Sequence, residues 1–235
     1  MSRTGIRRST VSARYSPRPR VWGLRRVFVE PSIDYFATQQ NVLESRERKL
    51  SLKSEFDSGH TLSLQITENL DHLFGPFAIR SGVVIPAATY VYSDATVGLQ
   101  SFPGRALSGQ LSVTAGNFYN GQRVSASVGA SWRFNKYFNV TPSYAQDQIN
   151  LPGNRFTTHI IRNRFNINFS ALVSLAGLVQ WSNDNRDLIA NARFNWIYRP
   201  GMDFYLVYTA VDNTSRSLTP KDRTLIAKVN YNLHF

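Results

Sequence analysis

The sequence predicts an all-β protein: an antiparallel, up-and-down transmembrane β-barrel, or the C-terminal part of a larger one, with about 12–14 strands. Apolar residues alternate with polar ones in segment after segment, and these segments recur about every dozen residues with turn residues between them. Each segment runs to about ten to thirteen residues, as a tilted strand that crosses a bilayer does, whereas strands of soluble sandwiches have nearer five or six.

The clearest strands lie in the second half of the chain. Between Val124 and Phe134 every second residue is apolar, with arginine, serine and glycine in between, and the segment 188–199 has the same pattern. Similar segments, which bring the expected number to about thirteen, are 10–15, 26–38, 49–57, 61–67, 89–99, 107–117, 138–147, 157–169, 171–181, 203–211 and 224–235.

The connections are expected to differ in length between the two ends of the strands. Bacterial barrels have short periplasmic turns and longer external loops. With the carboxyl terminus on the periplasmic side, the tight turns 57–60, 135–136, 169–170 and 199–201 fall inside, and the longer segments 71–87, 150–156 and 212–223 fall outside. The Asn120-Gly121 hairpin signal is the exception, because it predicts a tight turn on the external side.

The last strand alternates up to the terminal residue and ends on an aromatic side chain, where chain ends of soluble proteins normally fray. Its apolar face predicts a terminal assembly strand formed by Leu225, Ala227, Val229, Tyr231, Leu233 and Phe235.

Aromatic residues gather near strand ends, which is typical of side chains at the membrane–water interface. Those expected there are Trp132, Phe134, Trp181, Trp196 and Tyr198. The same residues would form the core of a soluble β-sandwich, and that alternative stays open.

The chain is strongly basic, with 27 lysines and arginines against 15 acidic residues and a formal net charge of +12. The basic residues are scattered through the strands and no nucleic-acid-binding motif accompanies them, so no nucleic-acid partner is expected. Only the first 26 residues form a dense cluster. We therefore divide the chain into a basic segment, 1–26, which could hold part of a strand, and a barrel, 27–235.

Basic residues of the later strands alternate with apolar ones. A charge on the lipid side near the middle of the membrane costs about 2–4 kcal/mol, so the lumen is the favoured place for them. The expected basic lumen residues are Arg123, Arg133, Arg162, Arg164, Arg193, Arg199 and Lys228. Two interpretations remain: a pore that attracts anions, or a plugged barrel in which these residues pair with carboxylates and backbone.

No pattern for enzyme chemistry is present, and neither a catalytic residue nor a metal or cofactor site is expected. The chain has no cysteine, and His60, His72, His159 and His234 lack the spacing of metal ligands. Asp71 and His72 are adjacent on an extended chain and therefore point apart. No run of eighteen apolar residues and no secretory signal occurs, so the export signal is expected elsewhere or the chain is a truncated fragment.

The segments 147–159 and 191–208, with the turn 116–121, resemble the C-terminal barrel region of bacterial outer-membrane proteins that carry an N-terminal carbohydrate-binding family 9-like domain. The resemblance extends from about Pro86 to the end of the chain; the sugar-binding domain itself has no counterpart here. It implies a location in the bacterial outer membrane, contact with outer-membrane lipid, lipopolysaccharide and the barrel assembly machinery, and carbohydrate binding only through the missing domain. No catalytic residues carry over from this family, whose function is unassigned.

Taken together, the patterns favour a passive channel or transport barrel with a basic lumen. A structural membrane anchor for a carbohydrate-binding module or a partner protein is the first alternative, and a soluble β-sandwich binding domain is the second.

Overall fold

The structure is a computed structural model that describes residues 6–215 and 217–231, and over these residues the chain forms fifteen antiparallel strands. No described helix is long and apolar enough to cross a membrane. The strands are β1 (Ile6–Ser12), β2 (Leu24–Thr38), β3 (Leu43–Phe56), β4 (Thr61–His72), β5 (Phe77–Arg80), β6 (Val83–Ile85), β7 (Thr89–Gln100), β8 (Leu107–Phe118), β9 (Gly121–Arg133), β10 (Phe138–Leu151), β11 (Asn154–Asn168), β12 (Val173–Ser182), β13 (Asp187–Arg199), β14 (Met202–Asn213) and β15 (Thr219–Asn230).

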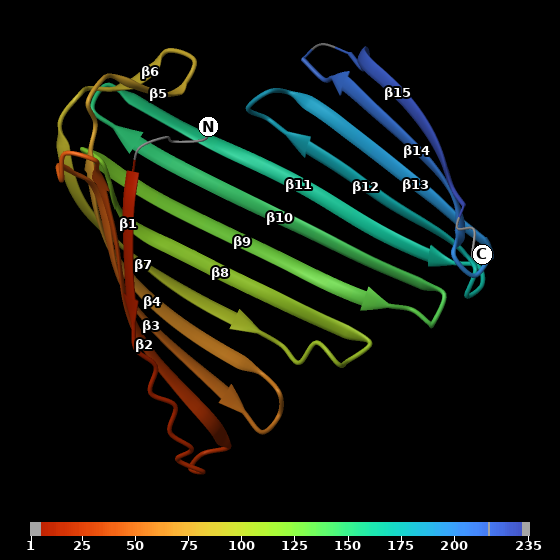
Figure 1. Cartoon of the computed structure of the whole chain (residues 1–235), viewed down its shortest axis with the longest axis horizontal. Helices are drawn as coiled ribbons and strands as arrows, with labels where there is room; N and C mark the ends of the chain where they lie inside the picture. The colour runs from red at the N-terminus through yellow and green to blue at the C-terminus, as the bar shows by residue number, and fades with distance from the viewer. Residues whose placement is uncertain (1–5, 216, 232–235) are drawn as a thin grey trace. The chain divides into compact units, whose positions relative to one another are not determined.

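Thirteen strands form one sheet in chain order, β1 to β4 followed by β7 to β15, and β5 pairs with β6 in a separate hairpin (Figure 1). The predicted all-β, up-and-down antiparallel architecture is confirmed. The thirteen strands of the sheet correspond to the segments recognised by their alternation. We call the end of the sheet where β2 begins and β3 ends the arginine end, and the end where β4 ends and β7 begins the hairpin end.

The expected difference in loop length is wrong for most of the chain. Only Pro152 and Gly153 lie between β10 and β11, because Gly153 adopts a φ of 78° that allows a tight turn. The segment 212–223 lies largely within β14 and β15. The long connection 73–88 remains, and it contains the β5–β6 hairpin, which the alternation did not predict.

The chain divides into two compact units. Unit 1 comprises residues 1–102, 111–126 and 147–157, and unit 2 comprises 103–110, 127–146 and 158–235. The basic segment 1–26 contains β1, which pairs along its whole length with β2, from Ile6 opposite Thr38 to Ser12 opposite Ser32.

In unit 1 the more exposed side of the sheet is the apolar one. Leu62, Leu64 and Ile66 of β4 are 42%, 37% and 49% exposed, whereas Thr67, which points to the opposite side, is 5% exposed. Strand β7 repeats this pattern, with Val97 exposed and its neighbour Thr96 half-buried. We call the side that carries Leu62 the apolar face of unit 1 and the side that carries Thr67 its polar face.

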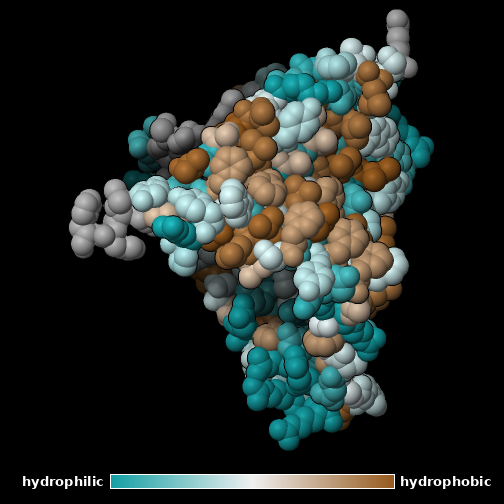
Figure 2. Space-filling model, turned by 90° about the vertical axis from the view of Figure 1, so that its right-hand side faces the viewer, coloured by the Kyte–Doolittle hydropathy of each residue, from teal (hydrophilic) through white to brown (hydrophobic). Residues whose placement is uncertain are grey.

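Unit 2 also has an apolar side and a polar side, which the strand register defines. On β11 and β13, however, the polar side is the more exposed one, because Arg164 and Arg193 are exposed while Phe165 and Phe194 are half-buried. The apolar face of unit 2 consists of cross-strand rows such as Val173, Trp196, Phe204 and Val229, or Leu175, Phe194, Leu206 and Ala227. On its polar face Arg164, Leu178, Asn191, Thr209 and Thr224 form one row. The next row from β12 to β15, Ala176, Arg193, Val207 and Ile226, is apolar apart from Arg193. Figure 2, which views the side of the molecule where the last strands lie, shows hydrophobic side chains gathered across the middle with hydrophilic ones around them.

A buried apolar core lies at the hairpin end of unit 1. It consists of Val83 and Ile85 from β6 and Ile149 and Leu151 from the end of β10. Leu151 lies beside Gly121, where an added Cβ would come within 2.9 Å of it. Gly121 and Arg123 share one side of β9 because they are two residues apart, so the β5–β6 hairpin packs onto the polar face.

Candidate functional site: the polar face

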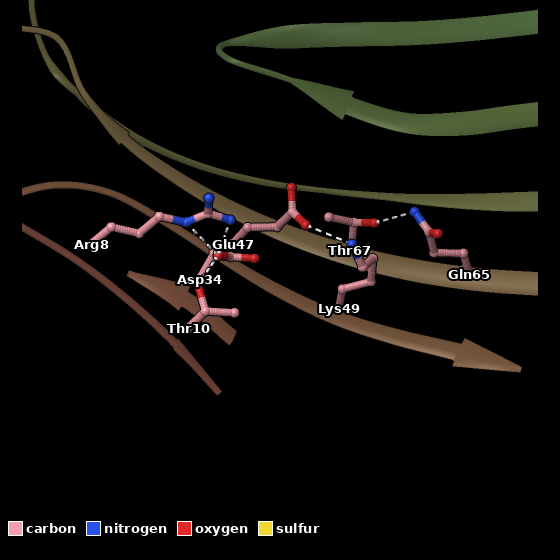
Figure 3. Close-up of polar contacts among 7 residues, drawn as sticks. All are labelled: Arg8, Thr10, Asp34, Glu47, Lys49, Gln65 and Thr67. Carbon is pink, nitrogen blue, oxygen red and sulfur yellow. Dashed lines mark hydrogen bonds and ion pairs between the residues drawn. The ribbon is translucent and has the colours of Figure 1, made fainter. Parts of the chain in front are cut away.

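A ladder of polar contacts crosses β1 to β4 on the polar face of unit 1 (Figure 3). Arg8 and Thr10 of β1 both point to Asp34 of β2, with Arg8 Nη2 and Thr10 Oγ1 at 2.8 and 2.6 Å from its Oδ1. The next strands continue the ladder, with Lys49 Nζ 3.1 Å from Glu47 Oε1 and Gln65 Nε2 3.2 Å from Thr67 Oγ1. Hydrogen-bonded polar side chains therefore line this face of unit 1 from β1 to β4.

Arg123, the first of the expected lumen residues, forms a two-pronged ion pair on the same face. Its Nε and Nη2 atoms lie 2.8 and 3.0 Å from the two carboxylate oxygens of Asp147, and its guanidinium lies over the ring of Phe118. Such a bidentate pair fixes the orientation of both side chains. At this position the charge is compensated, as the plugged-barrel interpretation requires.

Arg162, Arg164, Arg193 and Lys228 all lie on the polar face of unit 2. Arg162 donates from Nε to Gln180 Oε1 at 2.9 Å. The other three side chains have no hydrogen-bond or ion-pair partner within the described ranges, and Arg193 lies between Ala176 and Val207 on the neighbouring strands. This part of the polar face therefore carries uncompensated positive charge.

Arg133 and Arg199 lie at strand ends. Arg133 Nη2 donates to the backbone oxygens of Pro103 and Arg105, at 2.9 and 2.7 Å, and so holds the connection between β7 and β8. Arg199 is exposed at the turn between β13 and β14, next to a register shift in their pairing.

An aromatic cluster lies beside the buried core at the hairpin end. The ring of Tyr119 lies at its centre, with its centroid 5.3 Å from that of Tyr90, 5.1 Å from that of Tyr92 and 4.9 Å from that of Phe118. Tyr92 also donates a hydrogen bond to Asp71 Oδ2 at 2.7 Å. Desolvation raises the pKa of the Tyr119 hydroxyl in the turn that follows β8. Sequence reasoning missed this cluster, although the alternate aromatic residues Tyr90 and Tyr92, together with the adjacent pair Phe118 and Tyr119, were a usable signal.

The expected interface aromatics divide between the two ends of the unit 2 strands. Trp132 stacks on Phe134 with centroids 3.9 Å apart, and Trp196 meets Tyr198 edge-on, near the ends of β9 and β13. These four side chains are between 38% and 48% exposed. Trp181 lies at the opposite end of β12 and donates from Nε1 to Thr214 Oγ1.

The terminal assembly strand is described as far as Tyr231. Leu225, Ala227 and Val229 are opposite Tyr208, Leu206 and Phe204 of β14 and share their apolar face, and Tyr231 is 59% exposed. Leu233 and Phe235 lie outside the described residues.

The histidines and carboxylates form no metal-binding group of three among residues 6–215 and 217–231. His72 Nδ1 lies 2.6 Å from Thr89 Oγ1, while its neighbour Asp71 is hydrogen-bonded to Tyr92. The two side chains of the Asp71-His72 pair therefore engage different partners, as expected for adjacent residues on a strand.

No protein-family profile and no curated protein matches the chain. Among solved structures it is similar to a NanC porin, with 14% sequence identity and a TM-score of 0.38 over 95% of this chain and 99% of the porin.

Proposed function

We propose that this chain is part of an outer-membrane β-barrel that acts as a passive channel or transport barrel with a basic lumen. The observation that carries the proposal is the inverted order of the two faces in β4 and β7 of unit 1, where the more exposed side is apolar and the less exposed side is polar and hydrogen-bonded. In water this arrangement would expose a large contiguous apolar surface, which monomeric soluble proteins avoid. In a bilayer the same surface faces lipid.

The soluble-sandwich alternative needs a second sheet over the apolar face. Among the described residues the one additional sheet is the β5–β6 hairpin, and it packs on the polar face. Strands such as β3 and β11, of 14 and 15 residues, are also far longer than sandwich strands. Both features support the membrane proposal.

The number of strands favours a part of a larger barrel over a closed barrel of these strands alone. Over residues 6–215 and 217–231 the sheet has 13 strands, an odd number, whereas single-chain bacterial barrels have an even number because every neighbouring pair is antiparallel. We infer that at least one strand outside the described sheet completes the barrel. A longer reading frame that encodes further strands and a family 9-like carbohydrate-binding domain would support the proposed family relationship.

Planar-bilayer recording tests the channel directly. Because Arg164 and Arg193 are uncompensated on the polar face of unit 2, we expect the wild-type channel to conduct chloride in preference to potassium. Replacing Arg162, Arg164 and Arg193 with glutamine should weaken this preference, and replacing them with glutamate should reverse it. A selectivity that all three proteins share would contradict a basic lumen.

The anchor alternative has one observation in its favour. The β5–β6 hairpin packs a buried core onto the polar face and so occupies space at the hairpin end. If a folded barrel conducts no ions, and a variant lacking residues 76–86 conducts none either, the channel proposal is wrong and a structural anchor is the better assignment.

A further inference from the structure

The segment between β1 and β2 builds an open cavity of about 560 Å³ at the arginine end of unit 1. Four arginines and two carboxylates line it: Arg18, Arg20, Arg25, Arg26, Glu55 and Asp57. Arg26 lies opposite Glu55 in the register of β2 and β3, on the side that carries Phe28, Glu30 and Lys53. The cavity therefore opens on the polar face, away from the surface that we assign to lipid.

The arginines outnumber the carboxylates that could neutralise them. Glu55 accepts from Arg25 Nη2 at 3.1 Å and from Lys53 Nζ at 3.2 Å, so its charge is already compensated. Arg18 and Arg20 have no hydrogen-bond or ion-pair partner within the part of the chain that the structure describes, and Arg26 has only a contact with the ring of Phe28. Asp57 is the remaining carboxylate of the lining. The cavity thus has more guanidinium groups than the described residues satisfy.

The backbone that carries these arginines is held in place before any ligand arrives. Pro17 and Pro19 flank Arg18 and fix two φ angles of the segment. Val27 N bonds to Pro17 O at 3.0 Å, and Asp57 N bonds to Gly23 O at 2.8 Å, which ties the segment to both β2 and the end of β3. Arg20 adopts a φ of 53°, a conformation that non-glycine residues rarely take. A rigid segment loses little conformational entropy on binding, so the arginines are preorganised.

We propose that this cavity binds a phosphate-bearing solute, such as a free phosphate, a diphosphate or a phosphorylated small molecule. A guanidinium presents a planar set of N–H donors that matches the oxygens of a phosphate, and several guanidiniums together can satisfy a dianion. A carboxylate offers two oxygens and one charge and would leave donors unused. Since the cavity opens on the polar face, its ligand comes from the aqueous side and not from the lipid bilayer. The site stands independently of conduction, because it is defined by binding alone.

Calorimetric titration of the full chain in detergent micelles tests this site, with pyrophosphate, inorganic phosphate and acetate as probes. We expect pyrophosphate to bind at least tenfold more tightly than acetate. The double variant Arg18→Gln/Arg20→Gln should weaken pyrophosphate binding at least tenfold, whereas Asp57→Asn should strengthen it because it removes a repelling charge. The matched control is Arg7→Gln, since Arg7 bonds to Asn41 at the opposite end of β1 and its loss lowers the net charge without touching the cavity.

Three results would overturn the proposal. Acetate that binds as tightly as pyrophosphate would show that the cavity does not recognise phosphate. A loss of about threefold in Arg7→Gln, the share expected for one removed charge when two cost tenfold, would show that the net charge of the protein is responsible. Binding to vesicles that contain phosphatidylglycerol, with no binding of pyrophosphate or phosphate in solution, would assign the arginines to lipid headgroups.

Discussion

Single charged residues on the polar face fall into two groups, those with a fixed partner and those without. Arg123 and Asp147 form a bidentate pair in which the two side chains are 41% and 34% exposed. Partial exposure to solvent weakens such a pair, so its contribution to stability is modest even though its geometry is favourable. The unpaired Arg164 and Arg193 contribute to the local potential and not to the stability of the sheet.

The Arg123–Asp147 pair yields a residue-scale prediction. Asp147→Asn should lower the free energy of unfolding by about 1 kcal/mol, because one charged acceptor of a bidentate pair is lost. The control is Asp203→Asn on β14, since no ion pair or side-chain hydrogen bond of Asp203 is found in the described ranges. Urea unfolding in phospholipid vesicles, followed by tryptophan fluorescence, measures both variants. Equal stability of Asp147→Asn and the wild type would mean that solvent already screens the pair.

At the scale of the element, strand β4 shows how the alternation of apolar and polar residues gives one strand two different faces. Alternate side chains of a strand point to opposite sides, so Leu64 and Ile66 lie on one face while Gln65 and Thr67 lie on the other. The β5–β6 hairpin differs from β4 because its buried residues depend on a distant strand: Val83 and Ile85 form a core together with Ile149 and Leu151 of β10.

Two neighbouring residues of β4 test the assignment of its faces. Ile66 lies near the middle of the strand on the apolar face and is 49% exposed. If this face contacts lipid, Ile66→Arg should lower the free energy of unfolding in vesicles by about 2–4 kcal/mol. Gln65→Arg introduces the same side chain on the polar face and should change it by less than about 1 kcal/mol. A soluble surface would instead tolerate arginine at Ile66, and similar stabilities of both variants would argue against a lipid-facing role.

On the scale of the whole molecule, each internal strand of the sheet pairs with two neighbours, and the order follows the chain without crossovers. An up-and-down order lets each new strand form on the edge left by the one before it. The last strand β15 pairs with β14 along its length, from Asp203 opposite Asn230 to Asn213 opposite Thr219. Its far edge must find a partner in a membrane, where unpaired backbone groups are costly.

Assembly of the whole protein should depend on the face of the terminal strand. Tyr231→Asp places a charge where the apolar alternation of β15 continues, and we expect most of the protein to lose the heat-modifiable migration on gels that marks folded barrels. Asn230→Lys adds a single charge one residue earlier, on the polar side and opposite Asp203, and should fold normally. Loss of the folded band in both variants would show that added charge, and not lipid contact, blocks assembly.

Local alternation alone predicted the all-β class and the thirteen strands of the sheet. It also predicted that Arg162, Arg164 and Arg193 point to the side opposite the apolar residues, because the side to which a residue points depends only on its position along a strand. It predicted strand ends less well: the extension of β3 back to Leu43 depends on pairing with Ala37 of β2, which no short segment encodes. The tight turn at Pro152 and Gly153, in contrast, is encoded locally, because this dipeptide is a turn signal.

Tertiary structure alone decided how distant segments combine. Three features join residues from different strands and connections. They are the core that contains Val83 and Ile149, the ion pair of Arg123 with Asp147, and the cavity that Arg18, Arg20 and Arg26 line. The sequence showed that basic residues cluster in the first 26 positions, but it did not show that four arginines line one cavity. Whether an arginine is compensated or free depends on what lies across the sheet from it, and that is a property of strand register and of backbone hydrogen bonds between elements.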